Sequence, residues 1–283
     1  MGIVYSFLAV SFSLTVAQIL KITENKSLRV LPVLVINYAV ATLIGISTSP
    51  AKSVFQSSYP PVLIIIAVII GVLFIANLFV YSKSIDANGM GVSIASMRLS
   101  LAIPVGVSLF VYSEELSVIK ISGVLLSFVA LLLLVPRLSF KKVSTSTKAS
   151  LLILIFFFTG ISDSGLKIFE QEFGTSFPES LFLSIVFFSA FILGLFILIK
   201  NKELHFNTKE LLLGTLLGLA NHYSVYFVIS ALQELPGAQV FPIVNLAIVI
   251  GGALIGVLYW KDSHSKKQWI GLAIACISIT LLV

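Results

Sequence analysis

Four ionisable residues fall inside long apolar runs of this sequence: Arg98, Asp163, Lys167 and His222. A charge at the centre of a bilayer costs at least about 2.5–3.5 kcal/mol on insertion scales, so such residues usually face a cavity or a partner. A guanidinium is planar and permanently charged, and it can hold a carboxylate or phosphate through two parallel hydrogen bonds. Arg98 is therefore a candidate anchor for an acidic group on a ligand. The alternatives are a structural ion pair with Asp163 or bonds to backbone carbonyls.

Asp163 and Lys167 are four positions apart, so they share one face of a helix. Asp163 is a candidate proton carrier, and Lys167 a candidate second cationic contact for the ligand. The alternative is an internal Asp–Lys pair with no role in binding. The surrounding segment 160–165 is rich in glycine and serine, and it could break the helix so that freed backbone groups line a cavity.

Further polar groups at membrane depth are candidate ligand contacts. His222 titrates near neutral pH, which suits a proton relay or a hydrogen bond to substrate, although a neutral histidine bonded to a neighbouring helix fits equally well. Asn77, Asn221, Tyr226 and Asn245 complete the candidate binding set. Each of the asparagines could equally be an interhelical contact worth about 1 kcal/mol.

The elements that must position these residues follow from composition. Of 283 residues, 58% are hydrophobic and only 11% are charged, whereas soluble domains carry about 25% charged residues. Successive apolar runs of about 20 residues predict an all-α membrane protein with ten transmembrane helices. We expect these helices over residues 3–21, 30–47, 62–82, 89–112, 117–135, 149–169, 179–200, 210–232, 237–260 and 267–283.

The basic residues predict the orientation. On the side of the termini, only Lys52 and Lys120 lie in loops, while the loops of the other side carry all the remaining basic residues except Arg98 and Lys167. The positive-inside rule then places both termini outside the plasma (bacterial inner) membrane. The basic residues form no continuous stripe, so the lipid bilayer is an expected partner and nucleic acid is not.

The second half of the sequence repeats the first at an offset of 148 residues. Equivalent pairs are Gly89 and Gly237, Glu114 and Asp262, and Gly123 and Gly271. Five helices per half is an odd number, so the repeats 1–135 and 149–283, joined by a basic cytoplasmic linker over 136–148, must have inverted topology around a central cavity. Pro104 and Pro242 are expected to bend the fourth and ninth helices around that cavity.

Two motifs resemble the EamA branch of the drug/metabolite transporter superfamily. Glu114-Glu115-Leu116-Ser117 with Gly123 is similar to the family's G-E-x-L-S…G, and Asp262 to Gly271 form its second copy. The run from Val240 to Asn245 resembles V-F-P-I-x-N. This sequence departs from the family pattern at Ser113 and Lys261, where the family usually has glycine, at Asp262, and at His264 in place of leucine. The resemblance implies a ten-helix transporter of amino acids, metabolites or drugs, most commonly an exporter.

The sequence contains no phosphate-binding loop, no zinc-hydrolase or serine-hydrolase motif, and a single cysteine. We therefore expect no enzyme activity, cofactor or metal. The predicted function is secondary active export of a small organic metabolite, such as an amino acid or organic anion, by alternating access of two inverted halves. The sequence leaves open whether transport is coupled to protons and whether the protein is a monomer or a homodimer. The alternatives are a lipid-linked sugar or lipid flippase, and a non-transporting membrane sensor or assembly subunit.

Overall fold

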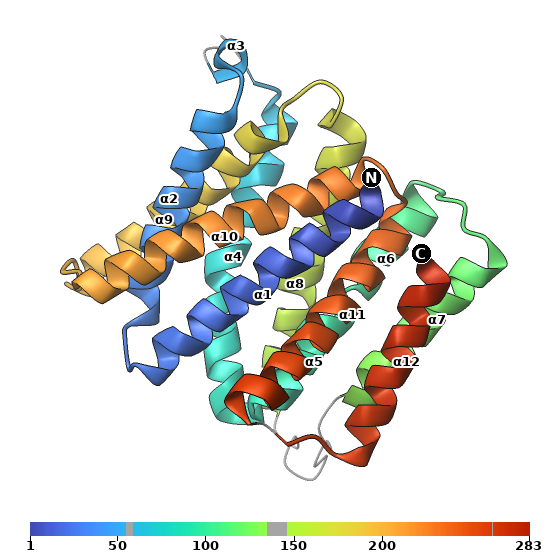
Figure 1. Cartoon of the computed structure of the whole chain (residues 1–283). Coiled ribbons are helices and arrows are strands. Elements are labelled where there is room, and N and C mark those ends of the chain that lie inside the picture. Colours follow the sequence, from blue (N-terminus) through green and yellow to red (C-terminus); the bar gives the residue numbers. More distant parts are fainter. Residues whose placement is uncertain (55–58, 135–145, 262) are drawn as a thin grey trace.

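The computed structural model describes residues 1–54, 59–134, 146–261 and 263–283, and it contains helices and no strand in these ranges (Figure 1). Long helices cross the molecule side by side, and the expected all-α class is confirmed. The elements are α1 (Gly2–Asn25), α2 (Val30–Thr48), α3 (Ala51–Val54), α4 (Pro61–Asn88), α5 (Met90–Leu99), α6 (Ala102–Gly106), η1 (Val107–Val111), α7 (Val118–Leu134), α8 (Ser146–Phe173), α9 (Glu179–Lys200), α10 (Thr208–Leu232), α11 (Gly237–Ile255), η3 (Gly256–Trp260) and α12 (Lys266–Leu282).

Each of the ten predicted runs coincides with a helical segment. Among the described residues, eight of these segments are long and apolar enough to cross a membrane. The other two, α7 and α12, have 17 residues each. Their role as membrane spans, and hence the count of ten, stays a prediction.

The fourth predicted run is interrupted. Helix α5 ends at Leu99, Ser100 and Leu101 form a turn, and α6 follows. Pro104 has no N–H to donate to the carbonyl of Ser100, and its ring would clash with that carbonyl in a regular helix. The Ser100 carbonyl instead accepts a bond of 2.9 Å from the N–H of Ile103. The expected effect of Pro104 therefore takes the form of a break.

The suggested break at 160–165 is wrong, because α8 passes through this segment without interruption. The hydroxyl of Ser162 donates to the Phe158 carbonyl and that of Ser164 to the Gly160 carbonyl, at 2.8 and 2.7 Å, so both serines bond within the helix. Gly160 lies so close to Ile103 of α6 that a β-carbon there would overlap it. The glycine serves close packing of two helices.

Two π-helical turns end the fourth and ninth runs, η1 and η3. Each is followed by a residue with left-handed backbone, Ser113 at φ 51° and Lys261 at φ 59°. These residues occupy equivalent positions in the repeat, and they are the positions where the resembling family usually has glycine. A β-carbon in this conformation costs about 1–2 kcal/mol.

We expect Ser113→Gly to raise the free energy of unfolding by about 1 kcal/mol, because glycine adopts positive φ without steric cost. Ser113→Val should lower it. Denaturation of the purified protein in detergent measures both changes. Ser263→Gly is the control, since Ser263 lies in the same kind of connection but has no positive φ. A loss of stability in Ser113→Gly equal to that in the control would contradict the assignment of strain.

The helices of the two halves interleave. Helix α1 packs against α10 and α11, α2 against α9 and α10, α4 against α8 and α9, and α7 against α12 (Figure 1). In the α7–α12 pair, Gly123 faces Leu282 and Gly271 faces Leu134. The same contact thus occurs twice, with the two halves exchanged.

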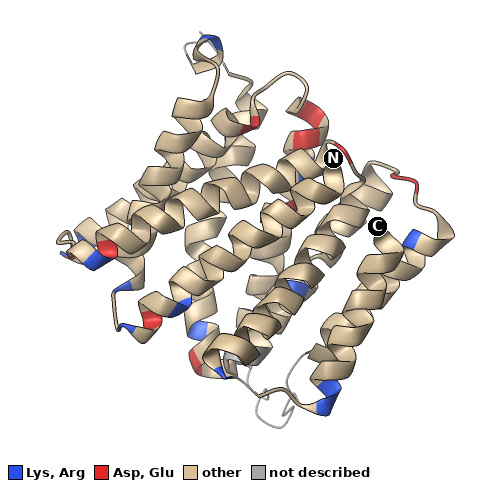
Figure 2. Ribbon diagram, viewed as in Figure 1, with Lys and Arg blue, Asp and Glu red and all other residues tan. Residues whose placement is uncertain are grey.

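Both termini lie at the same end of the bundle, which we call the terminal end (Figure 1). Most basic residues gather at the opposite end, here the basic end, while acidic residues are prominent near the termini (Figure 2). This distribution agrees with the loop charges used above to predict orientation. The greater part of the expected linker, residues 135–145, lies outside the described residues.

Candidate functional site

A cavity of about 330 Å³ reaches from the middle of α5 to the segment that precedes α12 at the basic end. Its wall is formed by α1, α5, α7, α11 and the first residues of α12, mostly with apolar or small side chains. The polar residues in the wall are Arg98, His264 and Gln268. Of the eight candidate binding residues, only Arg98 lines this cavity.

Arg98 is held by a single side chain. Its Nη1 donates to Oδ1 of Asn245 at 3.1 Å, and the Asn245 amide donates in turn to the Phe241 carbonyl at 3.0 Å. The Nε atom of Arg98 is buried and has no protein partner. The guanidinium is thus oriented by α11 and keeps donor capacity for another group.

Asp163 does not form the direct ion pair with Arg98 that the sequence left open as an alternative. Among the described residues, no ion pair within 4 Å joins the two side chains. The bond between Asn77 of α4 and Thr159 of α8 shows which face of α8 lies against α4. The Asn77 amide donates to Thr159 at 3.1 Å, and Thr159 is one helical turn before Asp163. Asp163 therefore lies on the α8 face that Thr159 turns toward α4.

Lys167 turns toward the terminal end and forms an ionic cluster there. Its ammonium lies 2.8 Å from Glu114 and 2.7 Å from Glu170, and it donates to Gln171 at 3.1 Å. The side chain is only 3% exposed. These four residues are called the Lys167 cluster below. The alternative of an internal Asp163–Lys167 pair is not formed, since two other carboxylates compensate the buried ammonium.

Glu114 also caps a helix of the other half. Its two carboxylate oxygens accept from the backbone N–H groups of Gly237 and Ala238 at 2.9 and 3.0 Å, where α11 begins. Helix N-termini offer unpaired N–H groups and a favourable dipole for an anion. Burial raises the pKa of Glu114, but the bonds from Ala238, Lys167 and Gly237 outweigh it and hold the pKa below its ordinary value.

Tyr112 lies beside the cluster. The Lys167 ammonium stands over its ring at 5.7 Å, and its hydroxyl donates to Glu172 at 3.1 Å. Burial, together with the bond to Glu172, raises the pKa of Tyr112 to about 12. The tyrosine is therefore a neutral hydrogen-bond donor at physiological pH.

The equivalent positions at the basic end form a neutral contact. Trp260 corresponds to Tyr112 at the offset of 148 residues, and near the starts of the two halves an offset of 149 residues pairs Gln18 with Lys167. The Trp260 indole donates to Gln18 at 2.7 Å. Lys21 stands over the Trp260 ring at 4.4 Å. Asp262, the counterpart of Glu114, lies outside the described residues. The position of Lys167 thus has an ion pair at the terminal end, and its counterpart Gln18 has a neutral hydrogen bond at the basic end.

The remaining candidates lie between helices away from the Arg98 cavity. His222 is 1% exposed between α10 and α2, and its ring bonds to the Ala41 carbonyl. Tyr226 stacks near it, with ring centroids 6.4 Å apart. Asn221 donates to Asn37 of α2 at 3.2 Å. The Asn221 bond joins α10 to α2, whereas the His222–Tyr226 contact lies within α10.

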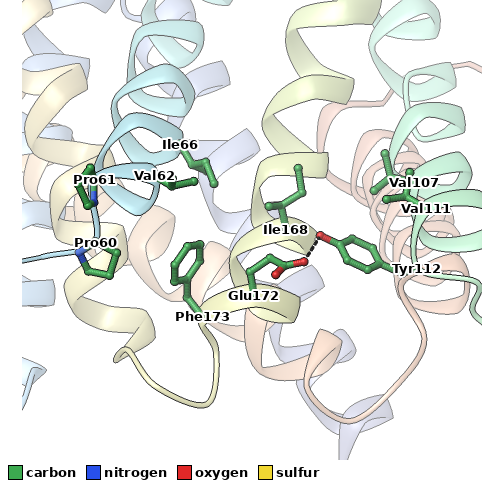
Figure 3. A pocket seen from close by; sticks show the side chains of 10 residues that line it. All are labelled: Pro60, Pro61, Val62, Ile66, Val107, Val111, Tyr112, Ile168, Glu172 and Phe173. Carbon is green, nitrogen blue, oxygen red and sulfur yellow. Dashed lines mark hydrogen bonds between the residues drawn. The ribbon is translucent and has the colours of Figure 1, made fainter.

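A second cavity, of about 520 Å³, opens between the start of α4, η1 and the end of α8 (Figure 3). Its wall is mainly apolar, and its polar groups, Tyr112 and Glu172, are bonded to each other. None of the described residues in its wall is basic. It therefore suits apolar chains better than a charged solute.

Sequence reasoning missed His264 and Gln268 as cavity residues and Glu170 and Gln171 as partners of Lys167. Gln268 belongs to a capping box with Ser265 that starts α12, a pattern readable from the sequence. Glu114 was expected only as a family motif. The local sequence carried no signal for the capping role, because the capped helix begins 123 residues later in the chain.

Comparisons with known proteins agree with this architecture. Residues 146–283 match the model of the EamA-like transporter family. An uncharacterized protein of Haemophilus influenzae (strain ATCC 51907 / DSM 11121 / KW20 / Rd) is 29% identical over 287 residues, covering 97% of this chain and 95% of its own. A solved crystal structure has the same fold with a TM-score of 0.79 at 14% identity, covering 99% of this chain and 95% of the other.

Proposed function

We propose, from the premise that this chain is a multi-pass integral membrane protein with an EamA-like transporter domain of the drug/metabolite transporter superfamily, that it is a secondary active exporter of a small organic metabolite. The observation that carries the proposal is the Arg98 cavity. A permanently charged group lies inside a membrane-spanning segment, is oriented by Asn245, and keeps an unpaired donor. Such a charge is costly unless it serves a ligand or a partner.

Alternating access supplies the mechanism. The Arg98 cavity extends toward the basic end, while the Lys167 cluster ties α8 and the Glu114 segment to the start of α11 at the terminal end. In this arrangement the cluster closes one entrance while the other leads to the site. Export requires the cluster to open and the contacts around Trp260 to tighten.

The contact pattern supports two inverted halves. The pairing of α1 with α10 corresponds to that of α8 with α4, and the pairing of α2 with α10 to that of α9 with α4. The reciprocal glycine contacts of α7 and α12 follow the same exchange. In a protein with inverted repeats, the two halves can exchange conformations by rocking, and the site then opens to the other side of the membrane.

Counterflow into proteoliposomes tests the proposal. Labelled amino acids, organic acids and nucleosides are offered to vesicles preloaded with the same unlabelled solute, with and without an imposed pH gradient. Saturable uptake of one solute is expected, and stimulation by the gradient would identify protons as the coupling ion. Folded protein that moves no solute of the panel would contradict the proposal.

A lipid or lipid-linked sugar flippase is the second candidate, and the apolar cavity of Figure 3 favours it. A flippase needs a lateral opening for acyl chains, and this cavity lies between helix ends, with a mainly apolar wall in which Glu172 is bonded to Tyr112. Movement of a fluorescent phospholipid between leaflets, faster than in protein-free vesicles, would support it. A membrane sensor or assembly subunit would show neither flux.

We propose that both termini lie outside the cytoplasm of a bacterial inner membrane. The basic end holds most basic residues of the described helix ends and loops (Figure 2), and such residues are retained on the cytoplasmic side. A periplasmically active phosphatase fused after Val283 should be active. A fluorescent protein that folds only in the cytoplasm should be dark in the same position, and the reverse result would overturn the orientation.

A further inference from the structure

We propose that the Arg98 cavity binds a small amphipathic organic anion, whose acidic group lies at Arg98 and whose other end carries a hydrogen-bonding group beside His264. This inference rests on the proposed function, because the ligand would be the transported solute. It names the chemical class of that solute and adds His264 as a residue that determines specificity.

The charge of the wall selects an anion. Among the residues that the structure describes, Arg98 and His264 are the titratable ones that line the cavity, and no carboxylate of that set belongs to the wall. Arg98 and Asp163 form no ion pair within 4 Å in the described residues. A guanidinium without a carboxylate partner is free to bind one from a ligand, and its planar fork suits that group.

Unpaired nitrogen atoms stand toward both ends of the cavity. Nε of Arg98 and Nδ1 of His264 are each buried without a protein hydrogen-bond partner. A buried polar atom left unpaired is unfavourable, because it has lost its bonds to water without replacing them. A ligand with an acid at one end and a polar group at the other would satisfy both atoms.

The wall between these ends is apolar. Leu14 of α1, Leu131 of α7 and Ile248 of α11 contribute to it, so the middle of the ligand must be hydrophobic. A volume of about 330 Å³ lies at the low end of the range of small-molecule sites. These features favour a compact anion over a lipid or a peptide.

His264 stands where the resembling family has leucine, so this chain has a polar group at a usually apolar position. The ring of Trp269 lies 5.8 Å from the His264 ring. The sequence has only two tryptophans, so in a Trp260→Phe background the fluorescence of Trp269 reports what happens at this end of the cavity.

The test uses the purified full-length protein in detergent with Trp269 as reporter. Hexanoate and hexanamide are the probes, because they share length and apolar body and differ in charge. We expect a saturable change in fluorescence with hexanoate, and at least about tenfold weaker binding of hexanamide. 6-Hydroxyhexanoate, which adds a hydroxyl at the far end, should bind more tightly than hexanoate.

Variants assign the two ends. Arg98→Gln should weaken hexanoate binding by about tenfold or more, and Arg98→Lys by less, since it keeps the charge. His264→Leu should abolish the preference for 6-hydroxyhexanoate while leaving hexanoate binding within a few fold. His205→Leu is the matched control, because His205 is a histidine outside this cavity, and it should change neither value.

Isothermal titration calorimetry of each folded variant checks that fluorescence reports binding. Equal binding of hexanamide and hexanoate, or no binding of either, would overturn the proposal, as would an unchanged affinity in Arg98→Gln. Binding of the anion without any counterflow would leave this inference standing and contradict transport. Counterflow of uncharged solutes without anion binding would support transport and contradict this inference.

Discussion

Replacing Lys167 by methionine is expected to lower the free energy of unfolding by about 3–5 kcal/mol, the usual cost of breaking a buried ion pair. The change removes the cation between Glu114 and Glu170, at 2.8 and 2.7 Å, and leaves two largely buried carboxylates without their shared cation, with only the backbone N–H bonds to Glu114 remaining. It should also loosen the terminal end. Thermal unfolding in detergent measures the first effect, and reaction of Ser108→Cys with a membrane-impermeant maleimide, in a Cys276→Ser background, measures the second.

Ser108 suits this readout because its hydroxyl is buried beside Gly237, at the start of α11 that Glu114 caps. Lys120→Met is the control, since Lys120 lies at the same end and donates one hydrogen bond to Gln239. The second change Glu170→Gln should restore part of the stability lost in Lys167→Met. If Lys167→Met and Lys120→Met have equal stability and equal labelling, the Lys167 cluster does not close the entrance at the terminal end.

Arg98→Gln is expected to lower the counterflow of an acidic substrate by about 100-fold, since loss of a charged contact in a desolvated site costs about 3 kcal/mol or more. Arg98→Lys should retain part of the rate, because it keeps the charge but not the planar fork. Initial rates in proteoliposomes, normalised to the amount of folded protein, measure both.

Lys209→Gln removes one positive charge from an exposed position at the basic end and serves as the control. It should transport at the rate of the unchanged protein. If Arg98→Gln folds normally and transports as fast as Lys209→Gln, Arg98 does not anchor the substrate.

The helices could be predicted because the bilayer imposes a length on each apolar run. The limits of α9 agree with the predicted 179–200, since charges bound that run sharply. The break after Leu99 was foreseen only as a bend: Pro104 indicates lost hydrogen bonding, but whether a helix bends or breaks depends on how the freed carbonyl is satisfied. Here Ile103 satisfies it locally.

The side-chain partners could not be predicted in the same way. Lys167 shares a helix face with Asp163, and local spacing made that pair attractive. Its ammonium instead bonds to Glu114, which comes from a distant part of the chain. Likewise Arg98 bonds to Asn245 of the other half. Which side chains pair depends on which helices become neighbours. The sequence gives little information about helix neighbours, because the faces that contact lipid and the faces that contact other helices are both apolar.

The interleaving of the two halves has a consequence for biogenesis. Helix α7 packs mainly against α12, and the ribosome synthesises α8 to α11 between them. Helices α1 and α2 likewise find their main neighbours, α10 and α9, only in the second half. During translation these early helices must therefore remain in the membrane as separate spans, with lipid in place of their final partners. Assembly of the bundle is then a late event, and chains interrupted in the second half should be substrates for membrane proteases.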